Sequence, residues 1–78
     1  MRDRLVALIA ARAHVEPSEL EDDTPLLSSG LVDSLLAIDL VREIERAAGL
    51  RIPPEDVSQE HLDTLGRILA YVAKRAKH

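Results

Sequence analysis

Residues 34–49, which read SLLAIDLVREIERAAG, decide the fold of this chain. Apolar side chains return at steps of three and four along the stretch, and charged side chains fill most positions between them. This period of about 3.6 residues indicates an amphipathic helix over residues 34–48, with one face turned toward a core. Leu40 and Ile44 belong to the apolar face, so we expect both side chains to be buried.

Both ends of this helix carry residue types that begin and end helices. Asp33 and Ser34 can each accept a hydrogen bond from the free N–H groups of a first helical turn. Gly49 is placed to take the left-handed conformation that closes a helix, with Leu50 as the apolar residue that follows. The sequence therefore predicts a helix with defined limits, the longest in the chain.

The segments outside this helix predict a small all-α bundle. Helical spacing of apolar residues predicts a helix over about residues 3–13 and another that begins near Asp63 or Thr64. A short helix is expected within residues 54–62, at a position that the sequence leaves open. We expect three main helices and one short helix, in one domain that covers residues 1–78.

Residues 17–33 predict a long ordered loop between the first two helices. Proline and glycine interrupt this segment, and it has no sustained helical period. Ser18 and Glu21 match the pattern of a capping box, but no apolar run follows, so at most one helical turn is expected there. The leucines of the segment are too apolar for a free linker, and we expect them to pin the loop onto the core.

Composition limits what such a domain can do. A chain of 78 residues has room for one small core, which must be aliphatic because the chain has one tyrosine, no tryptophan and no phenylalanine. There is no cysteine, which excludes disulfides, thiolate metal sites and a thiol nucleophile from the protein itself. If the chain handles thioesters, their sulfur must come from another group.

Charge is distributed unevenly along the chain. Residues 16–63 hold thirteen acidic residues and only three arginines, whereas both flanking segments are net basic. The acidic segment repels nucleic-acid phosphates and attracts basic protein surfaces, so we expect protein partners and no nucleic acid. Residues 5–11 faintly resemble the apolar part of a secretory signal, but the run is short for one and too short to cross a membrane. We expect a cytoplasmic monomer without membrane contact.

Ser34 stands at the first turn of the longest predicted helix, directly after the loop. The first N–H groups of a helix lack partners within it, and the helix dipole favours negative charge there. A phosphodiester on the Ser34 hydroxyl would be well placed, and the Asp33 carboxylate could help to hold Mg²⁺ during phosphate transfer. The structural alternative is that Ser34 only caps the helix, and the two roles are compatible.

The stretch SGLVDSL, residues 29–35, resembles the Asp-Ser-Leu motif of the acyl carrier protein family. The resemblance covers nearly the whole chain and continues in Asp23-Thr24-Pro25-Leu26, Leu40-Val41-x-x-Ile44-Glu45, Gly49-Leu50-x-Ile52-Pro53 and Asp63-Thr64-Leu65. A three-residue motif alone occurs often by chance. The motif together with these flanks is specific.

The resemblance implies a four-helix acyl-carrier-like bundle that is not itself a catalyst. It implies that Ser34 carries 4′-phosphopantetheine from coenzyme A, with Asp33 and Leu35 as the flanks that a phosphopantetheinyl transferase recognises. Mg²⁺ would be needed only during transfer, and the arm would supply the thiol that the chain lacks.

The resemblance also implies that partner enzymes contact the helix that begins at Ser34. The expected partners are a loading enzyme, either an adenylating enzyme or an acyltransferase, and downstream synthase or tailoring enzymes. Carried over by position, the expected contacts are Leu35, Ile38, Asp39, Arg42 and Glu43.

Two features depart from the pattern of fatty-acid carriers. The order of apolar residues after Ser34 is more similar to peptidyl carriers, and Arg42 and Arg46 interrupt the acidic face. The motif over residues 29–34 is also similar to discrete carriers such as the D-alanyl carrier. We therefore expect a carrier dedicated to one biosynthetic pathway, with an amino acid, a small acid or a polyketide unit as cargo, as in polyketide or nonribosomal peptide synthesis.

Two other functions stay open at this point. The chain could be an acidic helical docking domain that binds partners without a covalent cofactor. It could also be a small hydrolase with Ser34 as nucleophile and His61 as base, which would need an orienting carboxylate and an oxyanion hole as well. His14, His61 and His78 lack the spacing of metal ligands, so we expect no metal site.

Overall fold

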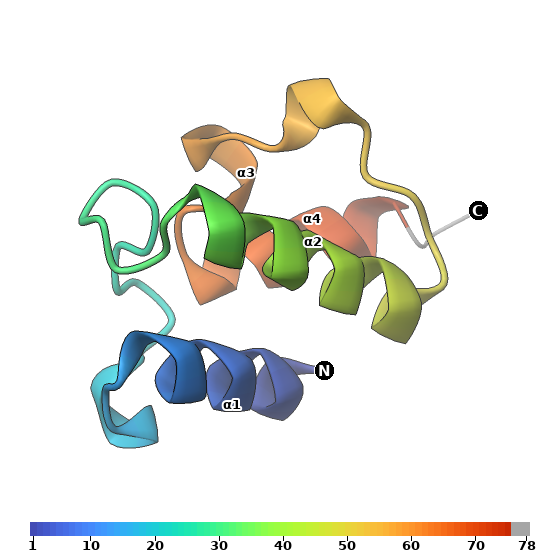
Figure 1. Ribbon diagram of the computed structural model, residues 1–78. Helices are drawn as coiled ribbons and strands as arrows, with labels where there is room; N and C mark the ends of the chain where they lie inside the picture. Colours follow the sequence, from blue (N-terminus) through green and yellow to red (C-terminus); the bar gives the residue numbers. More distant parts are fainter. Residues whose placement is uncertain (76–78) are drawn as a thin grey trace.

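The computed structural model describes residues 1–75, and within them it contains helices and no strand. The order of elements is α1 (Arg2–Ala13), η1 (Pro17–Glu19), α2 (Ser34–Ala48), η2 (Pro54–Asp56), α3 (Gln59–Leu62) and α4 (Leu65–Arg75), where η denotes a 3-10 helix. Helices α1 and α2 lie side by side and run in opposite directions (Figure 1). The all-α bundle that the sequence predicts is confirmed, with a long loop between α1 and α2.

Helix α2 forms where the sequence predicts it. The Asp33 Oδ1 atom accepts a hydrogen bond from the Leu36 N–H at 2.8 Å, so Asp33 is the N-cap. Gly49 closes the helix in the left-handed region at φ 68°, and its N–H donates to the Glu45 carbonyl at 2.9 Å. The buried face of α2 consists of Leu36, Leu40 and Ile44.

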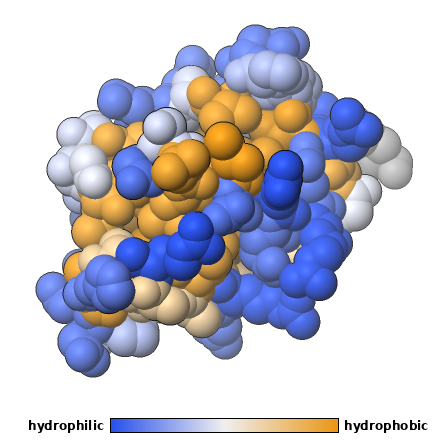
Figure 2. Space-filling view, in the orientation of Figure 1, coloured by the Kyte–Doolittle hydropathy of each residue, from blue (hydrophilic) through white to orange (hydrophobic). Residues whose placement is uncertain are grey.

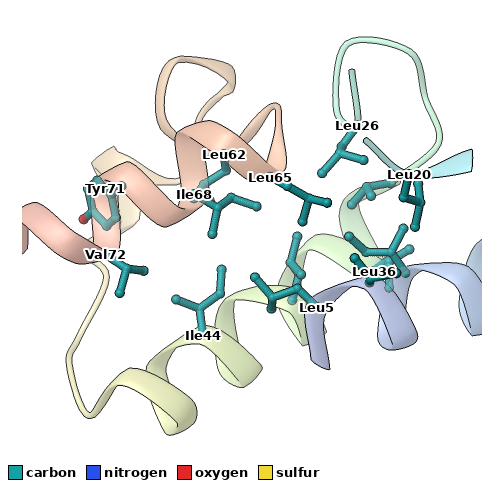
Figure 3. Packing of buried hydrophobic residues seen from close by; sticks show 14 of the residues in the cluster. Leu5, Leu20, Leu26, Leu36, Ile44, Leu62, Leu65, Ile68, Tyr71 and Val72 are labelled. Atoms are coloured by element: carbon teal, nitrogen blue, oxygen red, sulfur yellow. The ribbon is translucent and has the colours of Figure 1, made fainter. Parts of the chain in front are cut away.

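The core is aliphatic and joins the helices to the loop (Figure 3). Each main helix contributes side chains that are fully buried, among them Leu5 and Ile9 of α1 and Leu65 and Ile68 of α4. The loop adds Leu20, Leu26 and Val32, which are at most 3% exposed. The loop is therefore pinned to the core, as its leucines predict.

Two details differ from the sequence prediction. The turn in the loop is capped two residues earlier than expected, because Pro17 favours the first helical position and makes Glu16 the cap. The Glu16 N–H donates to Glu19 Oε2 at 2.9 Å, whereas the Glu21 N–H donates to a threonine hydroxyl. The short helix expected in residues 54–62 is split into η2 and α3, because Ser58 between them is extended, with φ −150° and ψ 167°.

None of the helices in residues 1–75 has the length and apolar character that a membrane-spanning helix needs.

Candidate attachment site and docking surface

Ser34 is exposed and is the first residue of α2. The N–H groups at the start of a helix have no acceptor within it. The Asp33 carboxylate accepts the N–H of Leu36. The N–H groups of Ser34 and Leu35 therefore remain available to an incoming anionic group. The Ser34 hydroxyl has no hydrogen bond within residues 1–75, whereas Ser28 and Ser29 nearby donate theirs to Asp63 and Pro25. The Ser34 hydroxyl is therefore exposed and not engaged within residues 1–75.

The loop that leads to Ser34 is held in place by Asp63. Asp63 Oδ1 accepts the N–H groups of Leu27 and Ser28, each at 2.8 Å, and Oδ2 accepts the Ser28 hydroxyl at 2.9 Å. Its carbonyl accepts the Leu26 N–H at 2.7 Å. The hydrogen bond from the Ser28 N–H is the main cause that lowers the pKa of the Asp63 carboxyl, against the opposing effect of burial.

Asp63 has a role that the sequence did not predict. The sequence offered Asp63 or Thr64 as the cap of the last helix, and Thr64 takes that role, since its Oγ1 accepts the Arg67 N–H at 3.1 Å. Asp63 itself is 8% exposed. The sequence around Asp63, which follows Leu62 and precedes Thr64, carried no signal of this role. A buried carboxylate needs hydrogen-bond donors, and those of Asp63 come from a distant segment. Asp63 thus ties residues 26–28 of the loop to the start of α4.

A groove of about 410 Å³ runs from Ser34 along α2. One wall is α2 and the other is the segment that follows it; the lining residues are Ser34, Ala37, Ile38, Val41, Arg42, Glu45, Ile52, Pro54 and Val57. We call this the α2 groove. Leu35 and Ile38 are 72% and 51% exposed, although both are large apolar residues. Figure 2 shows apolar surface gathered on this face of the molecule.

The acidic residues expected at the docking surface are held by arginines of the same chain. Asp39 Oδ2 lies 2.6 Å from Arg12 Nη2, and the Glu43 carboxylate lies between Arg4 at 3.5 Å and Arg46 at 2.9 Å. The hydrogen bond from Arg46 is the main cause that lowers the pKa of Glu43. Contact of Asp39 and Glu43 with partners stays a prediction.

His61 lies with a different set of residues from those around Ser34. Its Nε2 is 4.0 Å from Asp56 Oδ1, and its ring centroid is 5.0 Å from that of Tyr71. These residues line a pocket of about 550 Å³ that does not include Ser34, and no hydrogen bond within residues 1–75 joins Ser34 to His61. The pair that a hydrolase would require is not formed.

Tyr71 packs into the core from α4 and fixes η2 at the same time. Its hydroxyl donates to Asp56 Oδ2 at 2.6 Å, and the Arg75 guanidinium lies over its ring. Burial and, second, the hydrogen bond to Asp56 raise the pKa of Tyr71 to about 12. Residues 1–75 contain no group of three side chains that would hold a metal ion, and His78 lies outside the described residues.

The fold and the site define a class of protein: a small helical carrier domain with an exposed serine at the start of its longest helix. The chain belongs to the family described as phosphopantetheine attachment site, which matches residues 3–72. The acyl-carrier resemblance of the sequence is thereby confirmed, and the chain is a phosphopantetheine-attachment carrier domain.

Three relatives illustrate the range of this family. A D-alanyl carrier protein of Abiotrophia defectiva is 31% identical over 75 residues, which are 96% of this chain and 95% of that protein. An acyl carrier protein of Amoebophilus asiaticus is 29% identical over 96% of this chain and 91% of its own length. A non-reducing polyketide synthase of Stachybotrys chartarum is 33% identical over 86% of this chain, but this match is 2% of the synthase.

Proposed function

We propose that Ser34 is the attachment residue and that the chain carries acyl or aminoacyl groups as thioesters for one dedicated biosynthetic pathway. The observation that carries the proposal is the exposed, unbonded hydroxyl of Ser34 at the first residue of α2, on a loop that Asp63 holds rigid. Similarity to a D-alanyl carrier and to part of a polyketide synthase supports cargo of the aminoacyl or polyketide kind.

The residues around Ser34 fit a phosphodiester at its hydroxyl. In the transferase, the Ser34 hydroxyl oxygen attacks the β-phosphorus of coenzyme A and loses its proton to a base of that enzyme. The bond from this phosphorus to the bridging oxygen breaks, and adenosine 3′,5′-bisphosphate leaves. The first N–H groups of α2 and the helix dipole then stabilise the phosphodiester charge. Asp33 uses Oδ1 for the cap, which leaves Oδ2 to help hold Mg²⁺ during this step. Once attached, the arm supplies the thiol for cargo.

The expected partners follow from this chemistry. A phosphopantetheinyl transferase acts first, then a loading enzyme of the adenylating or acyltransferase type, and then synthase or tailoring enzymes. We place this work in the cytoplasm, where coenzyme A is available. In our proposal residues 1–78 act as a single monomeric domain that is a substrate of these enzymes and catalyses no step itself.

The first test is the intact mass of the chain before and after incubation with coenzyme A and a broad-specificity phosphopantetheinyl transferase. We expect a gain of one phosphopantetheinyl group in the parent and in the matched control Ser29→Ala, and no gain in Ser34→Ala. Circular dichroism should show that Ser34→Ala keeps its helices, because the side chain is exposed. A folded, initially unmodified parent without mass gain would favour the docking domain without a covalent arm.

A further inference from the structure

The acidic side chains of α2 already have partners within residues 1–75, although Glu43 Oε2 accepts no hydrogen bond there. Arg12 of α1 pairs with Asp39, and Arg4 and Arg46 hold Glu43 from two sides. The Glu43 side chain is only 17% exposed as a result. The Glu43 carboxylate is therefore largely covered, whereas the Asp39 side chain, 36% exposed, stays accessible beside Arg12.

The third acid of α2 is also engaged. Glu45 Oε2 accepts the Ile52 N–H at 2.8 Å and so ties the end of α2 to the segment that follows it. Arg42 differs from all three acids. It is exposed, it lines the α2 groove, and it has no ion pair or hydrogen bond within residues 1–75.

Arg42 stands on the route to Ser34. It lies eight residues further along α2, which places it about 12 Å from Ser34 along the helix axis. Leu35 and Ile38 lie between the two, and both are exposed apolar side chains. An enzyme whose active site closes over the Ser34 hydroxyl therefore covers Leu35 and Ile38 and reaches Arg42.

Arg42 forms no ion pair within residues 1–75, so a bound enzyme that covers it removes water from an unpaired charge. This desolvation costs free energy unless the enzyme supplies a group of opposite charge. We propose that the transferase that modifies Ser34 presents a carboxylate to Arg42, next to an apolar hollow that receives Leu35 and Ile38. This inference rests on the attachment of the arm at Ser34. The acidic segment of residues 16–63 predicts a basic surface on the partner. At Arg42 we propose the opposite, an acidic group on the partner.

Two charge effects act here over different ranges. The net charge of −4 attracts basic proteins at long range and can raise the rate of encounter. The contact at Arg42 acts only in the complex. Glu55 in η2 is exposed and follows Pro54, but it is not one of the residues that line the α2 groove. The acidic partner surface that we propose faces only the wall of the groove that α2 forms.

The test compares two charge reversals in the transferase reaction. Coenzyme A is saturating, the ionic strength is about 0.15 M to screen long-range attraction, and KM for the carrier is measured with a broad-specificity phosphopantetheinyl transferase. We expect Arg42→Glu to raise KM about tenfold or more with little change in kcat, and Arg42→Ala to give a smaller rise. Arg51→Glu is the matched control: it makes the same change in net charge at an exposed arginine that does not line the groove.

Each outcome decides the inference. A rise in KM for Arg42→Glu, a change within about twofold for Arg51→Glu, and relief of the difference at high salt would support it. Equal effects of the two reversals, or faster loading of Arg42→Glu, would overturn it, and faster loading would mean a basic partner surface. If the folded parent is not loaded at all, attachment at Ser34 fails instead. Thermal unfolding checks that each variant is folded, and Arg42→Ala gives the same sign if Arg42→Glu is unstable.

Discussion

Asp63 connects two parts of the chain that are distant in sequence. Its carboxylate receives donors from Leu27 and Ser28, which lie 36 and 35 residues earlier. These bonds fix the loop just before α2 and so fix the direction from which Ser34 is presented. One buried carboxylate thus links the start of α4 to the loop that precedes the proposed attachment residue.

Loss of the Asp63 carboxylate should destabilise the fold. We expect Asp63→Ala to lower the free energy of unfolding by about 2–3 kcal/mol, because the N–H groups of Leu27 and Ser28 lose their acceptor. Asp63→Asn should cost less, since an amide oxygen in the place of Oδ1 can still accept both N–H groups, and only the acceptor of the Ser28 hydroxyl is lost. Urea denaturation measures both. Equal and small losses would show that the loop does not depend on this carboxylate.

Single residues differ in how far the sequence could predict them. The exposure of Ser34 follows from its place at the start of a helix, and the structure agrees. For Leu35 the sequence leaves open whether it lies in the core or in an apolar partner surface, and the structure leaves it 72% exposed. The role of Asp63 could not be predicted, because its donors reach it only after the loop has folded back. Sequence spacing contains no information on such a contact.

Helix α2 separates its structural face from its functional face. Leu40 is 1% exposed and Leu35 is 72% exposed on the same helix. The apolar stripe that predicts the helix holds the bundle together, and residues outside the stripe form the exposed surface that we propose as the docking surface.

Truncation of one leucine on each face of α2 tests this division. Leu40→Ala should lower the free energy of unfolding by about 2–5 kcal/mol, because it leaves a cavity in the core. Leu35→Ala, the matched control, should change it by no more than about 0.5 kcal/mol. Thermal or urea unfolding gives both values. A small loss for Leu40→Ala would mean that the core of α2 lies on another face.

Long elements were predictable and short ones were not. Helices α1, α2 and α4 extend over several turns, so their apolar periods stand out in the sequence. The split of the expected short helix into η2 and α3 could not be predicted, because three or four residues are too few to show a period. The cap of η1 at Glu16 could have been predicted, because proline favours the first helical position and Pro17 follows Glu16. The capping-box match of Ser18 and Glu21 pointed to a different cap.

Across the whole molecule, α1 partly neutralises the acidic segment. Arg2 of α1 pairs with Asp22 in the loop, and Arg4 and Arg12 pair with acids of α2. The sequence shows a basic N-terminal segment and an acidic middle, but their pairing depends on the antiparallel packing of α1 and α2. Because arginines of α1 pair with these acids, fewer negative charges are available to a partner than the number of acidic residues suggests.

The stability of the whole domain should fall in acid. Hydrogen bonds hold the pKa values of Asp63 and Glu43 below their ordinary values of 3.8 and 4.5. A carboxyl whose pKa is lower in the folded state stabilises the fold above its unfolded pKa, and this contribution is lost as the pH falls through the folded value. The free energy of unfolding should be nearly constant from about pH 7 to 5 and decline below about pH 4.5.

Urea denaturation at several pH values checks this expectation. Asp63→Asn cannot titrate at this position, so its acid decline should be shallower than that of the parent. Parallel declines for the two proteins would assign the acid sensitivity to other carboxylates.

Tyr71 gives the molecule a property that no other residue shares. It is the only tyrosine of a chain without tryptophan or phenylalanine, so its phenol is the source of the near-ultraviolet absorption and fluorescence. That phenol is buried and donates to Asp56 in η2. The optical signal of the unlabelled protein therefore reports on one contact, the seam between η2 and α4. Absorption or fluorescence spectroscopy can therefore monitor this contact without an added dye.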